Sequence, residues 1–130
     1  MRIAIQGQAG SFHEQAAKQW YGPSATTIPC ITFGDVFQTY ARGEADAIVV
    51  AMENTIYGTI NETYRHIESC SAPIVGEVTL TIQQMLITNP GTKLEDITAV
   101  YSHPVALSQC QHFFQEHLPQ ATQIEDFDTA

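Results

Sequence analysis

The sequence predicts an α/β fold, because a strand that runs into a small or polar turn and then into a helix occurs three times along the chain. The strands are expected over residues 2–6, 47–52 and 97–101, and the turns begin at Gly7, Glu53 and Ser102. The 47–52 run is typical of a parallel-sheet strand that is covered on both faces. Ligands of such sheets bind at the carboxyl ends of the strands, so we expect the three turns to share one cleft.

The first helix is expected to begin at Ser11 and to end near Trp20 or Tyr21. Ser11 and Glu14 fit a capping box, in which the hydroxyl and the carboxylate each accept a hydrogen bond from a free backbone N–H. The Gly22-Pro23 pair is a typical helix stop. His13 falls on the presumed surface of this helix, as His66 does on a later one.

A short strand over 26–31 and a helix over 33–42 are expected next. Pro29 indicates an edge strand, because proline cannot donate to a neighbouring strand. The helix ends at Gly43. Its spacing places four large side chains on one face, namely Phe33, Val36, Phe37 and Tyr40.

The polar run Glu53-Asn54-Thr55 follows the 47–52 strand directly. Such groups are costly inside a core unless they have a use, and polar loops often carry sites. The alternative is a turn whose polar groups only satisfy backbone. A second capping box over 59–62 is expected to begin a helix that carries Ile60, Tyr64 and Ile67 toward the core.

Residues 74–88 have an extended, alternating pattern, which is long for one strand and suggests a strand that passes from one sheet to another. After the 97–101 strand, a helix from His103 carries Leu107, Cys110 and Phe114 at helical spacing and stops at Pro119. A last strand is expected over 121–127, and 128–130 resemble another helix start. The organisation is two α/β units, over 1–80 and 81–130, with a cleft between them.

Charge and composition exclude several classes of function. The 130 residues carry a net charge of -9 and only five basic side chains, which disfavours a nucleic-acid partner. An anionic ligand would depend on local donors such as helix N-termini.

No apolar run approaches the roughly 20 residues of a membrane helix, the N-terminus lacks a signal-peptide pattern, and three widely spaced cysteines fit reduced thiols. We therefore expect a cytoplasmic protein. No metal-ligand spacing and no dinucleotide or P-loop motif is present.

The motifs taken together resemble the prephenate dehydratase family. The segment 7–12 is similar to the family's opening glycine turn, and 53–58 is similar to its Glu-Asn-Ser/Thr segment. Gly76-Glu77-Val78 lies near the start of the extended segment that joins the two units, as in the family, and 102–110 is similar to the family's Ser-His-Pro helix start. These motifs occur in the family's order along the whole chain.

The resemblance implies a two-lobed fold of the periplasmic-binding-protein type II kind. It also implies conversion of prephenate to phenylpyruvate with loss of water and carbon dioxide, without a cofactor or metal, in a homodimer or higher homo-oligomer. The sequence contains no Thr-Arg-Phe segment, whose threonine is the family's expected proton donor. No regulatory ACT domain follows. The resemblance thus implies an N-terminal portion with an incomplete second lobe, and whether this chain alone is active stays open.

Carried over by motif, Asn54 and Glu53 are the candidate catalytic residues. Asn54 would bind the substrate or the leaving hydroxyl, or would only bridge a turn. Glu53 would orient Asn54 or lie near that hydroxyl, although an acid beside a dianion is repulsive unless protonated. The candidate substrate-binding residues are Ser11, Thr55, Ser102 and Gln109. Ser11 and Ser102 equally fit ordinary N-caps, and Gln109 fits a solvated helix surface.

Two other readings of the chain compete with the enzyme. The same fold serves small-molecule binding, so the chain would be a non-catalytic module for an aromatic carboxylate. Alternatively, it is a fragment without a function of its own. His103 is expected to be a helix-start residue rather than a base, and Cys110 a core residue rather than a nucleophile.

Overall fold

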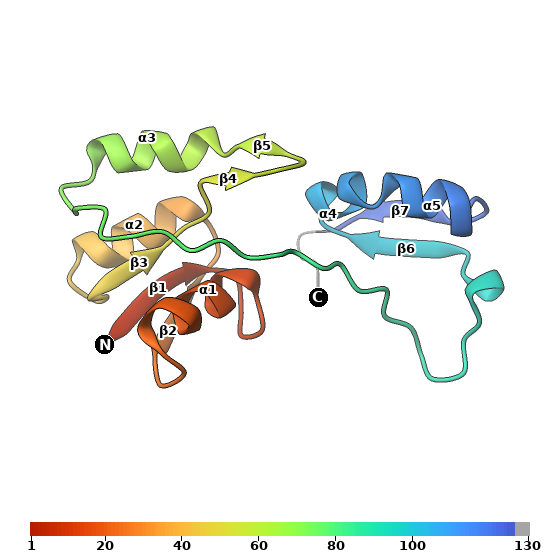
Figure 1. The fold of residues 1–130 in the computed structure, drawn as a ribbon, viewed down its shortest axis with the longest axis horizontal. Coiled ribbons are helices and arrows are strands. Elements are labelled where there is room, and N and C mark those ends of the chain that lie inside the picture. Colours follow the sequence, from red (N-terminus) through yellow and green to blue (C-terminus); the bar gives the residue numbers. More distant parts are fainter. Residues whose placement is uncertain (127–130) are drawn as a thin grey trace. The chain divides into compact units, whose positions relative to one another are not determined.

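The computed structural model describes residues 1–126 and divides into two units, Met1–Ile82 and Gln83–Ala130. Both units are α/β arrangements with parallel strands, as the sequence predicts (Figure 1). The first unit contains β1 (Arg2–Gln6), α1 (Phe12–Tyr21), β2 (Thr26–Cys30), α2 (Phe33–Ala41), β3 (Ala47–Val49), β4 (Glu53–Asn54), β5 (Gly58–Thr59) and α3 (Asn61–Ser69). The second contains the 3-10 helix η1 (Leu94–Asp96), β6 (Ala99–Ser102), α4 (Pro104–Gln109), α5 (Gln111–His117) and β7 (Thr122–Glu125).

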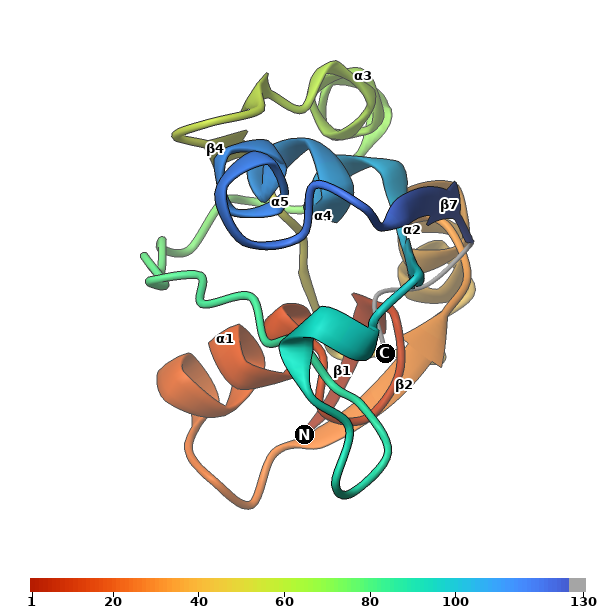
Figure 2. The same ribbon diagram turned by 90° about the vertical axis from the view of Figure 1, so that its right-hand side faces the viewer.

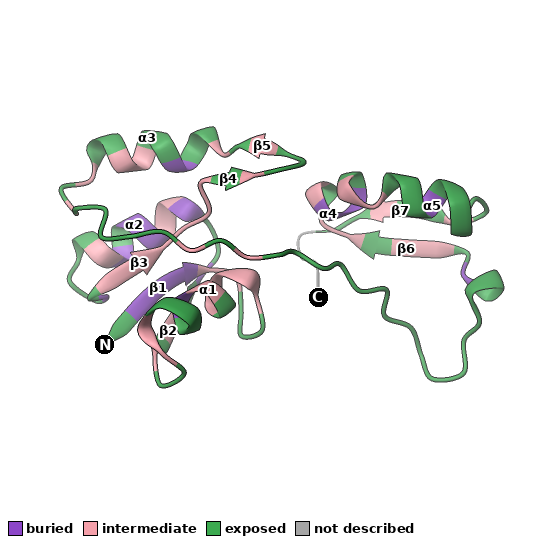
Figure 3. Ribbon diagram, in the orientation of Figure 1, coloured by how far each residue is buried: buried purple, intermediate pink, exposed green. Residues whose placement is uncertain are grey.

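The first unit is built around β1, the central strand of a parallel sheet with the order β2-β1-β3. Side chains alternate along a strand, so Ile3 and Ile5 pack on the side of α1, whereas Ala4 packs on the side of α2. Figures 1 and 2 show these two helices on opposite sides of β1. All three β1 side chains are at most 1% exposed (Figure 3). The core of the unit therefore lies on both faces of β1.

The two outer strands differ in how well the sequence predicts them. Among the described strands β2 pairs with β1 alone, with Pro29 opposite Ile5, which confirms an edge strand. The strand expected over 47–52 is shorter than predicted, because β3 ends at Val49. Its residues are half-buried, with Ala47 and Val49 packed on the α1 side of the sheet and Ile48 on the α2 side. Both faces of β3 are therefore partly covered, and among the described strands β1 is its only neighbour.

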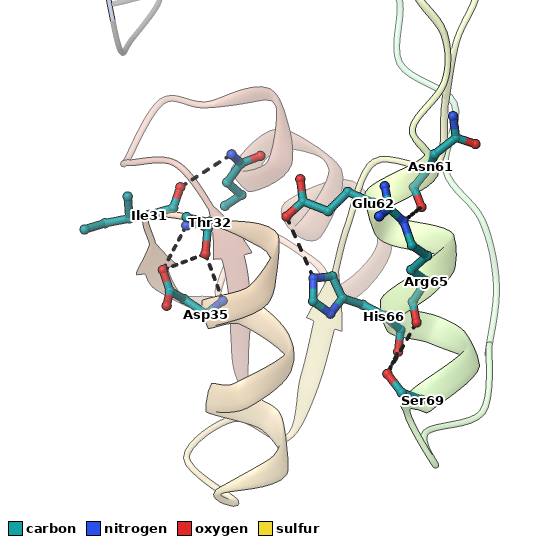
Figure 4. Close-up of polar contacts among 9 residues, drawn as sticks. Ile31, Thr32, Asp35, Asn61, Glu62, Arg65, His66 and Ser69 are labelled. Carbon is teal, nitrogen blue, oxygen red and sulfur yellow. Dashed lines mark hydrogen bonds and ion pairs between the residues drawn. The ribbon is translucent and has the colours of Figure 1, made fainter.

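Local capping positions the first two helices. The Ser11 hydroxyl accepts a hydrogen bond from the Glu14 N–H at 3.3 Å, as expected. The Glu14 carboxylate accepts instead from the Gly10 N–H at 2.8 Å, so the capping box is only half formed. α2 begins with a complete capping box between Thr32 and Asp35, a signal that the sequence analysis missed (Figure 4). Both helix starts therefore lie at the carboxyl edge of the sheet.

The apolar face of α2 largely follows the prediction. Phe33, Val36 and Phe37 are buried, while Tyr40 is half-buried. Cys30, at the end of β2, is buried in the same cluster as Val36. α2 thus forms one side of the core and offers its aromatic residues to neighbouring elements.

The predicted strand over 74–88 is absent: this stretch contains no helix and no paired strand. Val78 and Leu80 are half-buried and the residues between and around them are exposed, so some of the alternation survives. A strand needs a neighbour for its backbone hydrogen bonds, and no described strand lies beside this stretch. The alternation of residues within 74–88 does not indicate whether a partner strand lies beside them.

Gly76 packs against the indole of Trp20 on α1. A Cβ atom built at Gly76 would lie 2.2 Å from the Trp20 Cη2 atom, well inside van der Waals contact. The indole can move, because Trp20 is half exposed at 47%. The Gly76-Glu77-Val78 motif therefore includes a close approach to α1 that only glycine permits.

We expect Gly76→Ala to displace the indole, to shift the fluorescence of Trp20 toward longer wavelength and to lower the free energy of unfolding by about 1 kcal/mol. Trp20 is the single tryptophan of the chain, so its emission reports this contact directly. The neighbouring, exposed Glu77→Ala is the control and is expected to change neither quantity. An unchanged emission spectrum in Gly76→Ala would contradict the contact.

In the second unit β6 and β7 pair in parallel, with Tyr101 opposite Ile124. Ile97, Leu107, Phe114 and Leu118 form its buried cluster. The single helix expected from His103 is divided into α4 and α5 at Cys110, and α5 ends at His117, before Pro119. The last strand ends at Glu125, and the expected continuation to residue 127 and the helix start over 128–130 lie outside the described residues.

Candidate functional site

The Glu53-Asn54 motif forms one side of a short β-hairpin rather than a plain loop. Glu53 pairs with Thr59 and Asn54 with Gly58 in antiparallel register. Gly58 has a φ of 94°, which favours glycine and lets the chain return after the tip. The Ile60 N–H donates to the Met52 carbonyl at 2.9 Å and closes the base of the hairpin. The polar residues therefore occupy a defined turn at the end of β3.

Asn54 holds the tip of this hairpin through its side-chain oxygen. Oδ1 accepts hydrogen bonds from the N–H groups of Ile56 at 2.9 Å and Tyr57 at 2.8 Å. Only the oxygen of an amide can accept, so these bonds fix which way the amide faces. The Nδ2 group donates to no acceptor among the described residues and is left as a pair of unused donors.

Glu53 is held by two hydroxyl groups. Its Oε2 accepts from the Thr59 hydroxyl at 3.1 Å, and its Oε1 accepts from the Tyr64 hydroxyl at 2.8 Å. The hydrogen bond to Glu53 is also the main reason why the pKa of Tyr64 lies above its usual value. The expected capping box at Thr59 is wrong, because this hydroxyl bonds Glu53. The N-cap of α3 is Ile60, and no side chain caps the helix.

Thr55 lies at the tip of the hairpin beside Ile56 and Tyr57. Its side chain is exposed, and its hydroxyl makes no hydrogen bond to residues 1–126. Ile56 and Tyr57 are 71% and 59% exposed. Glu53, Asn54 and Thr55 are thus brought together on one turn with an apolar, uncovered tip.

α3 is attached to α2 through an aromatic contact. The His66 ring stacks on the buried Phe37 ring, with centroids 5.1 Å apart and planes inclined by 22°. Figure 4 shows Glu62 and His66 extending from α3 on the side of α2, with Glu62 Oε1 and His66 Nε2 3.8 Å apart. His66 therefore has a packing role rather than the plain helix surface that was expected.

The buried face of α3 also differs from the prediction. Thr63 is fully buried, whereas Ile60 and Ile67 are half-buried and Tyr64 is 41% exposed. The expectation that Tyr64 faces the core is wrong, because its ring turns to the hairpin and its hydroxyl reaches Glu53. α3 therefore links the hairpin to α2.

Ser11 lies on the loop after β1, apart from the hairpin along the chain. It is the N-cap of α1, and Gly7 allows its close approach: a Cβ at Gly7 would lie 3.2 Å from the Ser11 Cβ. The N-cap interpretation is therefore confirmed, whereas contact with a ligand stays a prediction. An N-cap serine can still offer its O–H outward, because its oxygen accepts only one bond here.

His13 is packed against α2 rather than lying on a helix surface. Its ring meets Phe33 edge-on, with centroids 5.7 Å apart. Its Nε2 atom is buried and has no hydrogen-bond partner among the described residues. Burial disfavours the charged imidazolium and lowers the pKa of His13.

His13 therefore makes folding sensitive to acid. Between its lowered pKa and the unfolded value of about 6.5, the unfolded chain binds more protons, so stability falls as the pH drops, by at most about 1.4 kcal/mol per pH unit. We expect His13→Phe to remove this part of the dependence. Denaturant unfolding of both proteins between about pH 5 and pH 7 measures the difference. Parallel pH curves for the two proteins would contradict the burial of a neutral His13.

Ser102 and Gln109 lie in the second unit. Ser102 is at the end of β6, and Gln109 is at the end of α4. Ser102 is the last residue of β6, and the N-cap of α4 is His103, whose Nδ1 accepts from the Val105 N–H at 3.2 Å. The N-cap interpretation of Ser102 is therefore wrong, and that of His103 as a helix-start residue is confirmed. Gln109 ends α4, and its Oε1 accepts from the Gln84 amide at 3.0 Å. Each keeps an unused donor within the described part of the chain.

Cys110 is a packing residue. It lies against the cluster of Leu107 and Phe114, and burial raises the pKa of its thiol, which disfavours the reactive thiolate. Residues 1–126 contain no group of three or more His, Cys, Asp or Glu side chains arranged to hold a metal ion. None of the described helices is long and apolar enough to cross a membrane.

Comparisons with known proteins agree with the motifs. A family model described as prephenate dehydratase matches residues 3–130. The chain is 38% identical over 112 residues to arogenate dehydratase 2 of Petunia hybrida, covering 86% of this chain and 28% of that protein. It is 39% identical over 119 residues to the bifunctional chorismate mutase/prephenate dehydratase of Escherichia coli K12, covering 89% and 31%. The chain thus spans less than a third of the length of either relative.

A solved structure is similar over nearly the whole chain. The crystal structure of prephenate dehydratase from Arthrobacter aurescens in complex with L-Phe matches with a TM-score of 0.88 and 31% identity. The match covers 98% of this chain and 43% of that protein's chain. The α/β arrangement described above therefore corresponds to part of a longer polypeptide in that protein.

Proposed function

The chain belongs to the prephenate dehydratase family, and we propose that it forms the first part of a catalytic region that converts prephenate to phenylpyruvate. Carbon dioxide and the ring hydroxyl leave together, the leaving hydroxide takes up a proton to become water, and formation of the aromatic ring drives the reaction. We further propose the two-lobed fold of the periplasmic-binding-protein type II kind, with lobes at 1–80 and 81–130 and the second incomplete. The family match over residues 3–130 supports this assignment.

The observation that carries the mechanism is the orientation of Asn54. Its Oδ1 is occupied by the Ile56 and Tyr57 N–H groups, so its Nδ2 donors face away from the turn. A donor that is already held in place costs no reorganisation when charge develops on the substrate. We place Asn54 at the leaving hydroxyl, whose oxygen gains negative charge as the carbon–oxygen bond breaks.

Glu53 is the second proposed catalytic residue, next to Asn54 on β4. Both of its oxygens already accept hydrogen bonds from hydroxyls. Because both oxygens are held in this way, we assign Glu53 the role of orienting the hairpin that carries Asn54 near the leaving group.

Ser11, Thr55, Ser102 and Gln109 are the proposed substrate-binding residues. All four are neutral and can donate hydrogen bonds to carboxylates. Neutral donors are needed because the chain has a net charge of -9 and little attraction for anions over distance. Ser11 adds the N-terminal end of α1, which favours negative charge. The chemistry needs no cofactor, and we keep a cytoplasmic homodimer or higher homo-oligomer as a prediction.

A second candidate substrate is arogenate, because the relative from Petunia hybrida is named an arogenate dehydratase. Arogenate carries an amino group where prephenate carries a keto oxygen, and the same elimination yields phenylalanine. The complete polypeptide that the gene encodes should be offered each substrate separately, with the products separated by chromatography. Phenylpyruvate formed faster than phenylalanine supports the prephenate assignment.

The same assay separates the enzyme from a binding module. Saturable binding of prephenate without either product would support a module for aromatic carboxylates. Turnover of arogenate alone would change the substrate and keep the chemistry. Neither binding nor turnover by the folded protein would overturn the proposal.

A further inference from the structure

Glu53 is tied to two elements that the catalytic motif does not include. Thr59 reaches Glu53 from the opposite strand of the hairpin, and Tyr64 reaches it from the second turn of α3. Both donor groups are hydroxyls, and together they occupy both oxygens of the carboxylate. Tyr64 therefore connects the hairpin to a helix that is packed on the core.

The hairpin needs such a connection. β4 and β5 have two residues each, and an isolated two-stranded hairpin is at best marginally stable in water. α3, in contrast, is anchored by the fully buried Thr63 and by the stack of His66 on Phe37. A continuous set of contacts thus runs from α2 through α3 and Tyr64 to Glu53, the neighbour of Asn54.

We propose that Tyr64 is a positioning residue, whose hydroxyl holds Glu53 and through it fixes the direction in which Asn54 presents its Nδ2 donors. The consequence for catalysis rests on the proposed function, whereas the consequence for the hairpin does not. Tyr64 itself touches no reacting atom in this account. Its hydroxyl is protonated at neutral pH, as for an ordinary tyrosine with a pKa of about 10, and the Glu53 contact raises the pKa of Tyr64 further.

The first test compares Tyr64→Phe with Tyr40→Phe in the complete gene product. Tyr40 is on α2, and its hydroxyl has no hydrogen bond within the described residues, so its loss is the matched control. We expect Tyr64→Phe to lower kcat roughly 3- to 10-fold, the equivalent of one hydrogen bond, with KM changed less than about 2-fold. Tyr40→Phe is expected to leave kcat, KM and Tm unchanged.

A double variant tests whether Tyr64 acts through Glu53. Once Glu53→Ala has removed the acceptor of the Tyr64 hydroxyl, adding Tyr64→Phe is expected to reduce kcat little further, because contacting residues in one network are not additive. If the decrease in kcat of the double variant equalled the product of the two single decreases, the proposal would be overturned.

Backbone hydrogen exchange gives a readout that does not depend on activity. The Ile56 and Tyr57 amides are protected by Asn54 Oδ1, so their exchange reports the orientation of that side chain. Tyr64→Phe is expected to speed exchange at both amides, and Tyr40→Phe is not. Equal exchange in the two variants would overturn the proposal. If the wild-type protein turned over neither substrate, the proposed function would fail while this comparison still decided the role of Tyr64.

Discussion

Asn54→Asp is expected to lower kcat for prephenate by about 10²- to 10³-fold, the size of effect seen when one preorganised donor is removed from an active site. Aspartate keeps an oxygen that can accept from the Ile56 and Tyr57 N–H groups, so the turn is expected to persist. What it loses is the pair of Nδ2 donors. The measurement is steady-state phenylpyruvate formation by the complete gene product.

Asn54→Ala is the matched variant, because it removes the turn acceptor as well as the donors. It is expected to lose as much activity as Asn54→Asp, but to speed hydrogen exchange at the Ile56 and Tyr57 amides, which Asn54→Asp does not. Near-normal activity in Asn54→Asp together with an inactive Asn54→Ala would show that Asn54 serves the turn only. The two variants therefore separate the structural role from the catalytic one.

Ile5→Ala is expected to lower the free energy of unfolding by about 2–5 kcal/mol, a large part of the roughly 5–15 kcal/mol of a typical domain. Ile5 is 1% exposed and packs with Ile3 and Ala17 on the α1 side of the sheet. Removing most of the Ile5 side chain leaves a cavity in the core beside β1, a strand that is covered on both faces. Urea unfolding followed by the fluorescence of Trp20 measures the change within the same unit.

Ile31→Ala provides the control for that prediction. The chemical change is identical, but Ile31 is 84% exposed, so we expect an effect within about 0.5 kcal/mol. Equal unfolding midpoints for the two variants would mean that β1 is not the centre of the core.

The first half of the fold could be predicted from the sequence because its signals are local. β1 has the predicted bounds, and the helix expected over 33–42 is observed as Phe33–Ala41. Ser11 caps its helix through a contact only three residues away, and Gly22 ends it with a φ of 92°. Neighbours this close in sequence leave a recognisable pattern.

The candidate site could be predicted only in part. The sequence places Asn54 in a turn after a strand, but strands of two residues leave no periodicity, so the hairpin went unseen. The capping-box pattern at Thr59 is present, yet its hydroxyl bonds Glu53 across the hairpin. The contact from Tyr64 joins residues eleven positions apart, and no local pattern announces it.

Elements that depend on neighbours were predicted least well. Alternation over 74–88 indicated a strand, but pairing requires a second strand beside it, and none lies there in the described residues. The helix from His103 is interrupted at Cys110, whose φ and ψ of -99° and 7° leave the α-helical region. Apolar spacing continues through that position and so gives no sign of the break.

The most direct measurement of the central claim is the rate at which phenylpyruvate forms from prephenate, using residues 1–130 and the complete gene product side by side. We expect the complete product to turn over prephenate at a rate that depends on Asn54, and we expect the Asn54→Asp variant to bind prephenate while its turnover falls by about 10²- to 10³-fold. A folded complete product that forms no phenylpyruvate, or forms it equally well with Asn54→Asp, would contradict the account.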